Sequence, residues 1–99
     1  MSDWEIEIHP YFIKDLDKLS KRELEIFYSK KQKIKQNPER QKHLSGEINC
    51  YREPITDNIR MIYFTQGKKI WLLTIGPHDK SYDQFRKRLH SLRTKYGLV

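Results

Sequence analysis

The segment from residue 69 to residue 76 constrains the fold most, because both of its alternating sets of side chains are apolar. One set holds Ile70 and Leu72, and the other holds Trp71, Leu73 and Ile75. A strand that is apolar on both faces belongs inside a sheet whose two faces are both covered. The pattern therefore predicts that this segment is an interior strand, with helices packed over the sheet.

The chain before this segment predicts a strand followed by two helices. Residues 4–9 alternate between apolar and polar side chains, as in a half-buried strand. Pro10 suits the first turn of a short helix that ends near Leu19. Ser20 lies three residues before a glutamate, which is the capping-box spacing that opens a second helix. Asn37 and the proline after it should end that helix.

The second half of the chain predicts a three-stranded meander and a final helix. After a polar connection at 39–47, strands are expected at about 48–53, 59–65 and 69–76. The capping-box spacing of Ser81 and Gln84 predicts that the final helix starts there, after a loop that carries His78. Its apolar seam consists of Tyr82, Phe85, Leu89, Leu92 and Tyr96. Residues 1–99 therefore form a single α+β domain, whose antiparallel-dominated sheet is packed by helices.

The net charge of +7, from 20 lysines and arginines against 13 acids, indicates an acidic partner. The excess is concentrated in residues 21–43, with a charge of +5, and in residues 68–99, with +6. This distribution favours nucleic acid or an acidic protein as the partner. The second predicted helix carries a basic face made by Lys30, Lys31, Lys33 and Lys35. Such a face is usually only solvated, and phosphate or partner binding is the alternative.

The composition also restricts the class of protein. The single cysteine, Cys50, excludes an internal disulfide, indicates a reducing compartment and suits a buried strand position. The start of the chain lacks a signal-peptide pattern, and the longest apolar run, residues 70–75, is too short to span a membrane. We therefore expect a cytoplasmic protein. The scattered histidines and acids predict neither a metal site nor a cofactor.

Arg52 and Arg60 are candidates for holding an anion. They lie on adjacent strands of one predicted hairpin, where we expect them to be nearly opposite one another on one face. Two like charges in that position are unfavourable unless an anion lies between them. The anion is either a carboxylate, from Glu47, Glu53 or Asp57, or a phosphate. Arginine suits a phosphate because its planar fork binds two oxygens and stays charged.

The residues after the last predicted strand are candidates for proton transfer. His78 follows Gly76 and Pro77, and an exposed imidazole there can act as a general acid or base near neutral pH. Tyr82 either packs in the core or takes part in stacking or proton transfer, and Lys80 could hold a phosphate. The other histidines are predicted to lie on the surface or in loops, namely His9, His43 and His90. Arginines with a histidine and a tyrosine are the side chains that metal-free RNA cleavage uses.

Together these features resemble the RelE/ParE toxin superfamily, and within it the RelE-like, ribosome-dependent mRNA interferases. The resemblance covers almost the whole chain and includes the order of its elements. The matching segments are Pro10-Tyr11-Phe12, Lys18-Leu19, Leu44-Ser45-Gly46, Cys50-Tyr51-Arg52, residues 58–63 and Ile75-Gly76-Pro77-His78.

The resemblance implies the toxin of a toxin–antitoxin pair, an endoribonuclease that cuts mRNA in the ribosomal decoding site. It implies that Arg52 and Arg60 contact the scissile phosphate, and that His78 transfers a proton. The site aromatic would be Tyr82 or Phe85. The implied partners are a cognate antitoxin, the ribosome and mRNA, without a metal or cofactor. The residues assigned to RNA or ribosome binding are Lys30, Lys31, Lys33, Lys35 and Lys80.

The chain departs from the family prototype at two places. The prototype's second strand carries two lysines where this chain has Arg52 and Pro54, and it has an arginine where this chain has His78. The general base is therefore open among His78, Glu53 and Asp57. Two alternatives to the nuclease are a ParE-like inhibitor of DNA gyrase, which does no chemistry itself, and an inactive basic binding module. The set of two arginines and a histidine favours the nuclease, since a pure binding protein does not need it.

Overall fold

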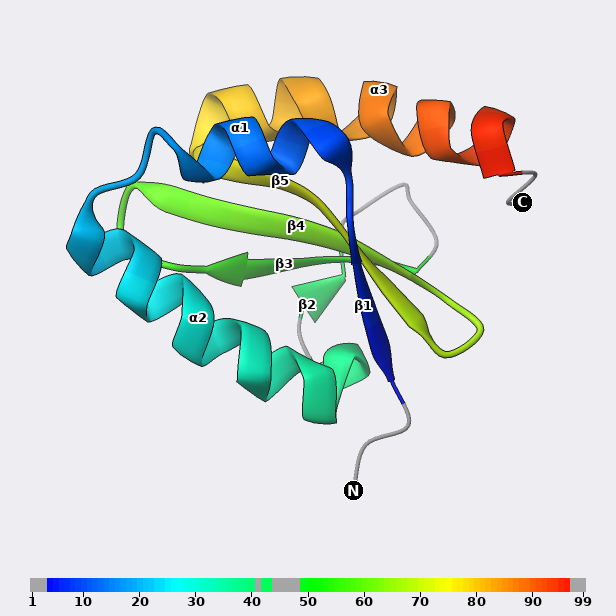
Figure 1. The fold of residues 1–99 in the computed structure, drawn as a ribbon, viewed down its shortest axis with the longest axis horizontal. Helices are drawn as coiled ribbons and strands as arrows, with labels where there is room; N and C mark the ends of the chain where they lie inside the picture. Colours follow the sequence, from blue (N-terminus) through cyan, green and yellow to red (C-terminus); the bar gives the residue numbers. More distant parts are fainter. Residues whose placement is uncertain (1–3, 41, 44–48, 97–99) are drawn as a thin grey trace.

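The computed structural model describes residues 4–40, 42–43 and 49–96 and contains a five-stranded sheet with helices packed on it (Figure 1). Its elements are β1 (Glu5–Ile8), α1 (Pro10–Leu16), α2 (Lys21–Gln36), the 3-10 helix η1 (Pro38–Arg40), β2 (Lys42–His43), β3 (Cys50–Pro54), β4 (Ile59–Gln66), β5 (Lys69–Pro77) and α3 (His78–Tyr96). This order confirms the predicted α+β class.

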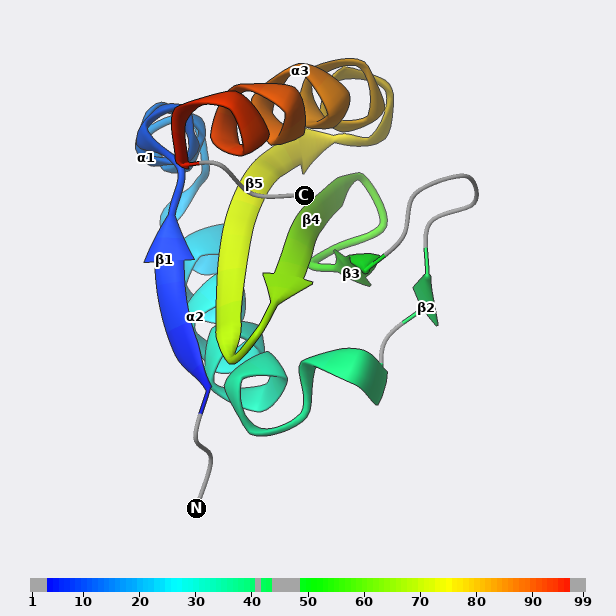
Figure 2. The ribbon, with the colours of Figure 1, turned by 90° about the vertical axis from the view of Figure 1, so that its right-hand side faces the viewer.

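The strands lie in the order β1-β5-β4-β3-β2, so β5 is flanked by a strand on each side (Figure 2). β1 runs parallel to β5, and the other neighbouring pairs are antiparallel. Every residue from Ile70 to Gly76 is buried. The doubly apolar segment is therefore an interior strand, as predicted, and antiparallel pairs dominate the sheet.

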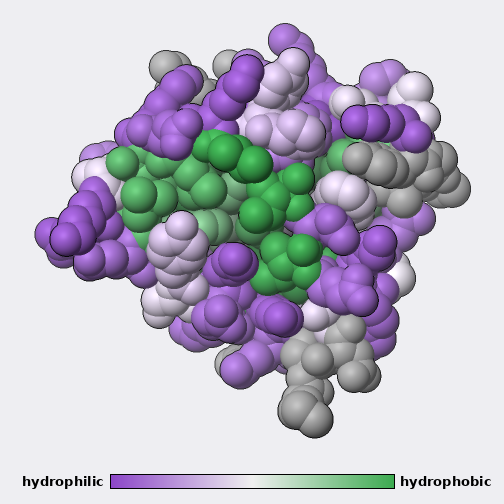
Figure 3. Space-filling view, in the orientation of Figure 1, coloured by the Kyte–Doolittle hydropathy of each residue, from purple (hydrophilic) through white to green (hydrophobic). Residues whose placement is uncertain are grey.

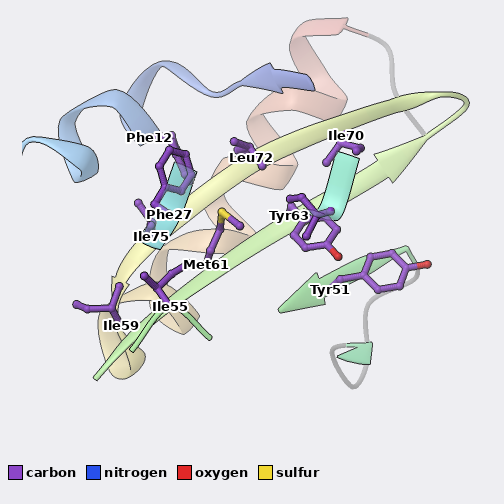
Figure 4. Close-up of a cluster of buried hydrophobic side chains, with 11 residues drawn as sticks. Phe12, Phe27, Tyr51, Ile55, Ile59, Met61, Tyr63, Ile70, Leu72 and Ile75 are labelled. Atoms are coloured by element: carbon purple, nitrogen blue, oxygen red, sulfur yellow. The ribbon is translucent and has the colours of Figure 1, made fainter. Parts of the chain in front are cut away.

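Two hydrophobic clusters cover the two faces of the sheet. On one face, Phe12 of α1 and Phe27 of α2 pack against strand residues such as Met61 and Leu72 (Figure 4). On the other face, α3 packs on the strands through a cluster of Cys50, Ile62, Phe64, Trp71, Leu73, Phe85, Leu89 and Leu92. Successive side chains of a strand point to opposite faces, so β4 and β5 are apolar at both sets of positions. The burial of Cys50 also agrees with its prediction as a small hydrophobic residue.

The predicted ends of α2 are confirmed. Ser20 Oγ accepts a hydrogen bond from the backbone N–H of Glu23 at 3.2 Å. Glu23 Oε1 accepts one from the backbone N–H of Ser20 at 2.8 Å, which completes the capping box. The helix ends at Gln36, with Asn37 as its C-cap. Local side-chain chemistry therefore defines this helix at both ends.

The predicted end of the first helix was wrong. α1 ends at Leu16 rather than near Leu19. The backbone N–H groups of Lys18 and Leu19 bond to carbonyls three residues earlier, those of Asp15 and Leu16, each at 3.1 Å. The chain thus leaves α1 through tight turns of the 3-10 type.

The predicted start of the last helix was also wrong. α3 begins at His78, directly after β5, instead of at Ser81 after a loop. Pro77, the residue directly before the helix, has a fixed φ angle that is compatible with a helix start. Residues 39–47 were predicted to be a connection, whereas η1 overlaps the start of this region and the short strand β2 lies within it.

An apolar strip crosses the face of the molecule that is seen in Figure 1, with hydrophilic side chains around it (Figure 3). α1 and the turn after it expose apolar side chains, because Ile13 is 55% exposed and Leu16 and Leu19 are only half-buried. Among the described residues, no helix is long and apolar enough to cross a membrane.

Candidate active site

Arg52 and Arg60 lie on the same face of the sheet, the face that α3 covers. Arg52 pairs with Ile62, and Pro54 pairs with Arg60, so the two arginines are diagonal neighbours. Diagonal positions on an antiparallel pair are about 7–8 Å apart. The expectation of a shared face is confirmed, whereas the expectation that the arginines are nearly opposite was wrong. The hairpin closes between Ile55 and Ile59, later in the chain than expected.

The guanidinium of Arg60 is anchored to the hairpin turn. Its Nη1 donates to the carbonyl oxygen of Thr56 at 2.7 Å and to that of Asp57 at 3.2 Å. The turn itself is ordered by Thr56 Oγ1, which accepts hydrogen bonds from the backbone N–H groups of Asn58 and Ile59 at 3.3 and 3.1 Å. Arg60 is half-buried. Its charge is therefore held at a defined place at one end of the sheet.

The sequence prediction missed the strand position of Lys42. In the register of β2 against β3, Lys42 pairs with Arg52. Lys42, Arg52 and Arg60 thus occupy neighbouring positions on three adjacent strands. The sequence analysis did not identify Lys42 as a strand residue because it predicted residues 39–47 to be a connection without a strand.

The start of α3 lies at the same end of the sheet as Arg60. Gly76 pairs with Arg60 and Pro77 pairs with Ile59, so His78 follows immediately after this point. The side chains of the predicted site residues here lie outside the described residues, namely His78, Lys80 and Tyr82. Phe85 is only 2% exposed and belongs to the core under α3. A ring buried in the core cannot stack on a nucleobase, so Phe85 does not suit the predicted role of site aromatic.

Glu53 lies on the opposite face of the sheet from the two arginines. It is 3% exposed, and one of its carboxylate oxygens is 3.4 Å from Nζ of Lys30 on α2. A carboxylate in this position is separated by the sheet from the side chains of Arg52 and Arg60, which argues against the prediction of Glu53 as a general base. Asp57 is exposed in the hairpin turn beside Arg60 and stays a candidate.

The lysines of α2 form a surface separate from the arginines, because α2 covers the other face of the sheet. Lys33 and Lys35 are exposed, whereas Lys30 and Lys31 are half-buried. Nζ of Lys31 lies 5.9 Å from the centre of the Tyr28 ring. Lys30 contributes its charge to the buried carboxylate of Glu53.

His9 is buried, which contradicts its prediction as a surface or loop residue. It is 5% exposed and is the N-cap of α1, where its Nδ1 accepts a hydrogen bond from the backbone N–H of Tyr11 at 3.1 Å. Burial lowers the pKa of His9, the charge of Arg88 lowers it further, and Asp15 partly opposes the shift. His90 is exposed, as predicted, and the side chain of His43 lies outside the described residues.

Arg88 of α3, which the sequence analysis did not single out, forms a mostly buried ion pair with Asp15 of α1. Its Nη1 is 2.5 Å from Asp15 Oδ2, and its Nη2 is 3.3 Å from Oδ1. The side chains are 11% and 16% exposed. Arg88 was missed because its helical position is on the polar side of the predicted seam, and its partner is distant in sequence.

Metal ligation is not indicated in the described part of the chain, where no group of three or more His, Cys, Asp or Glu residues could hold a metal ion. The arrangement offers the anchored guanidinium of Arg60, with Arg52 on the same face, near the start of α3, whose first turns contain His78 and Tyr82. Such an arrangement can bind a phosphate and stabilise negative charge that develops on it.

Comparison with known proteins identifies the family. No family model matches the chain. It is 33% identical over 85 residues to a protein of Methanocaldococcus jannaschii named "Putative toxin RelE4", and the match covers 80% of this chain and 90% of the relative. The chain belongs to the RelE family of toxins.

Solved structures of RelE proteins have the same fold. A mutant of the Escherichia coli toxin RelE in the free state matches with a TM-score of 0.76 and 19% identity, over 90% of this chain and 99% of the other. The RelE–RelB complex of Pyrococcus horikoshii matches with a TM-score of 0.63 and 25% identity, over 75% of this chain and 93% of the other.

Proposed function

We propose that this RelE-family chain is a metal-independent endoribonuclease that cleaves mRNA on the ribosome. The observation that carries the proposal is the pair Arg52 and Arg60 on one face of the sheet, with the start of α3 at the same end. A protein that only binds a partner has no need of cations fixed beside a histidine. RelE membership supports the toxin role, and the nuclease activity is our inference from the site.

In the proposed reaction, the 2′-hydroxyl of the RNA attacks the adjacent phosphorus. The new bond joins the 2′ oxygen to phosphorus, and the bond from phosphorus to the 5′ oxygen breaks. A base, Asp57 or His78, takes the proton of the 2′-hydroxyl, and an acid donates a proton to the leaving 5′ oxygen. The products are a 2′,3′-cyclic phosphate and a 5′-hydroxyl end.

Each site residue has a proposed role in that reaction. Arg52 and Arg60 stabilise the negative charge of the phosphorane, and the anchoring of Arg60 to Thr56 means that little reorganisation is needed. His78 transfers a proton at near-neutral pH. Tyr82 stacks on or orients a base.

The basic surface of α2 is proposed to contact ribosomal RNA. Lys31, Lys33 and Lys35 belong to this surface, and Lys80 at the start of α3 is proposed to hold a substrate phosphate. Lys30 has a smaller role in binding, because its charge is already engaged by Glu53. So small a domain would gain much of its substrate positioning from the ribosome.

A cognate antitoxin is the proposed regulatory partner. The similar P. horikoshii toxin was solved as a RelE–RelB complex, which supports such a partner for this chain. The apolar strip of Figure 3 is the kind of surface that marks a protein interface. A cytoplasmic location is also proposed, because the proposed substrate is mRNA on the ribosome.

The decisive experiment is the mapping of RNA ends in cells after brief induction of the chain. Cuts that follow the codon phase of translated mRNA, with 5′-hydroxyl ends, support the proposed function. An Arg52→Ala variant expressed at the same level should give none of these cuts. Growth arrest with DNA damage and without such ends would instead support gyrase inhibition and refute the nuclease.

A further inference from the structure

The turn between β3 and β4, residues 55–58, is closed by the side chain of Thr56. None of these residues has a positive φ, so the turn does not depend on a glycine-like conformation. Instead, Thr56 Oγ1 accepts hydrogen bonds from the backbone N–H groups of Asn58 at 3.3 Å and Ile59 at 3.1 Å. Threonine hydroxyls that accept from the backbone a few residues later stabilise turns in this way. The shape of this turn therefore depends on Thr56 Oγ1 as well as on the backbone.

The core fixes the two ends of the turn but not its middle. Ile55 and Ile59 are 6% and 8% exposed and belong to the hydrophobic cluster on the face that α1 and α2 cover (Figure 4). The carbonyl oxygen of Ile59 also accepts from the backbone N–H groups of Ile55 at 2.9 Å and Thr56 at 3.2 Å. Asp57 and Asn58 are exposed. The hydroxyl of Thr56 therefore acts on the part of the turn that the core does not cover.

The carbonyl groups that hold Arg60 belong to this middle part. Arg60 Nη1 donates to the carbonyl oxygens of Thr56 at 2.7 Å and Asp57 at 3.2 Å. Both carbonyl groups lie in the stretch of chain between the Thr56 side chain and the N–H of Asn58. The ring closed by the hydrogen bond from Asn58 to Thr56 Oγ1 therefore contains both of them. This side-chain hydrogen bond sets the orientation of both acceptors for Arg60.

A fixed guanidinium is useful in the proposed reaction. The group is rigid and planar, so holding Nη1 limits the directions in which its other N–H groups can point. A cation that is placed before charge develops on the phosphate needs no reorganisation when the reaction occurs. A loose arginine would instead lose side-chain freedom on reaching the transition state.

We propose that Thr56 is a positioning residue for Arg60. Its hydroxyl orders the turn whose carbonyl groups hold the guanidinium in place for the scissile phosphate, and Thr56 itself does not contact the RNA. This inference rests on the proposed function, because it assigns Thr56 a part in the same reaction. It adds to the arginines a residue that acts only through the turn.

The first test compares variants of Thr56 in single-turnover cleavage of mRNA on saturating ribosomes. Thr56→Val keeps the branched shape but removes the acceptor, and cleavage should slow by about tenfold, as for the loss of one hydrogen bond that holds a catalytic group. Thr56→Ser keeps the acceptor and should cleave within about twofold of the original rate. Thr56→Ala, which lacks the acceptor and needs less space, is the second test variant. Asn58→Ala, at an exposed side chain of the same turn, is the control and should cleave normally.

The second test asks whether Thr56 acts through Arg60. Thr56→Val should slow cleavage in the original chain but cause no further loss in an Arg60→Ala background, because the group that it positions is already absent. A purely structural role would slow cleavage by the same factor in both backgrounds. Urea unfolding establishes that every variant is folded at the assay temperature.

The third test measures the hold on Arg60 without cleavage. Rotation about the Nε–Cζ bond of an arginine slows when a terminal nitrogen is hydrogen-bonded, and NMR of the guanidinium nitrogens reports its rate. We expect faster rotation of Arg60 in Thr56→Val than in the original chain or in Thr56→Ser. The spectrum of Arg60→Ala assigns the signals, since only those of Arg60 disappear.

The proposal is overturned if Arg60 rotates at the same rate in Thr56→Val and Thr56→Ala as in the original chain. It is also overturned if these variants cleave at the original rate, or if they slow cleavage equally with and without the Arg60 guanidinium. In each of these cases the original chain still cuts RNA, so the proposed function stands. A chain that cuts no RNA on ribosomes refutes the proposed function and removes the role of Thr56 in the reaction, whereas the rotation of Arg60 shows separately whether Thr56 orders its guanidinium.

Discussion

Asp15 and Arg88 hydrogen-bond to backbone groups on the edge of β5, just beyond the point where its pairing with β1 ends. Arg88 Nη1 donates to the carbonyl oxygen of Leu73 at 2.8 Å, and Asp15 Oδ2 accepts from the backbone N–H of Ile75 at 3.3 Å. A neighbouring strand would normally bind these backbone groups. The ion pair therefore replaces a strand along this edge and ties α1, β5 and α3 together.

This relationship predicts a large loss of stability in Asp15→Asn. The amide keeps the size of the carboxylate but leaves the mostly buried Arg88 without a counter-charge. We expect the free energy of unfolding to fall by about 2–4 kcal/mol, slightly less than for a fully buried pair. Urea unfolding measures this change in the free energy of unfolding. Asp17→Asn, at the exposed neighbouring acid, should change stability by less than about 0.5 kcal/mol, and an equally small effect at Asp15 would refute the role of the pair.

The second prediction separates the charge of Arg60 from its role in the turn. Arg60→Ala should slow cleavage by about 10²–10³, which corresponds to the loss of one preorganised cation. Arg60→Ala also removes the hydrogen bonds to Thr56 and Asp57, so its unfolding free energy must be measured alongside. Arg52→Ala is the comparison that leaves the turn intact. Wild-type cleavage rates in both folded variants would exclude the arginines from the mechanism.

The third prediction is a dependence of stability on pH that comes from His9. Its pKa is lowered in the folded state, so the unfolded chain binds the proton more readily. The stability that neutral His9 provides is complete above the unfolded pKa, about 6.5, and is lost as the pH falls toward the folded value. His9→Asn keeps an N-cap acceptor but cannot titrate. Chemical denaturation at a series of pH values should show that this variant loses less stability on acidification than the original chain does.

The control for that prediction is the exposed His90. His90→Asn should retain the acid-dependent loss of the original chain, because the site of His90 is solvated in both states. If His9→Asn and the original chain lose stability in parallel below pH 6.5, then His9 is not the group responsible.

The fourth prediction concerns proton transfer by His78. Single-turnover cleavage should depend on pH in roughly the range 5.5–8, where an imidazole titrates. His78→Gln should abolish that dependence and slow cleavage by about 10²–10⁴, with RNA affinity little changed. Tyr82→Phe should preserve the rate if the ring only stacks. If the pH profile of cleavage is unchanged in His78→Gln, the proton transfer must instead be carried out by Asp57, by Tyr82 or by the ribosome.

The fifth prediction distinguishes two lysines of α2. Lys33→Ala should weaken ribosome binding and flatten its salt dependence while leaving stability unchanged, because the side chain is exposed and its phosphate contact would release counterions. Lys30→Ala should mainly lower stability, since it leaves the buried carboxylate of Glu53 without its partner. Salt titrations of binding and urea unfolding measure the two effects. Identical behaviour of the two variants would contradict the division of roles.

The sequence by itself determined the features that depend on short spacings. The capping box at Ser20, the proline at the start of α1 and the doubly apolar β5 all follow from residues a few positions apart. The same is true of the α3 seam at Phe85, Leu89 and Leu92. Propensity, capping and alternation act locally, so a single sequence contains the information for them.

The tertiary structure decided the features that depend on pairing between distant segments. The diagonal placement of Arg52 and Arg60 follows from where the hairpin closes, and Glu53 lies on the opposite face of the sheet from both arginines. His9 and Arg88 look like surface residues by local pattern, but β1 pairs with β5 in parallel and brings α1 against α3. Register across a turn and contacts across a sheet are set by the packing of the whole core, so no local pattern contains them.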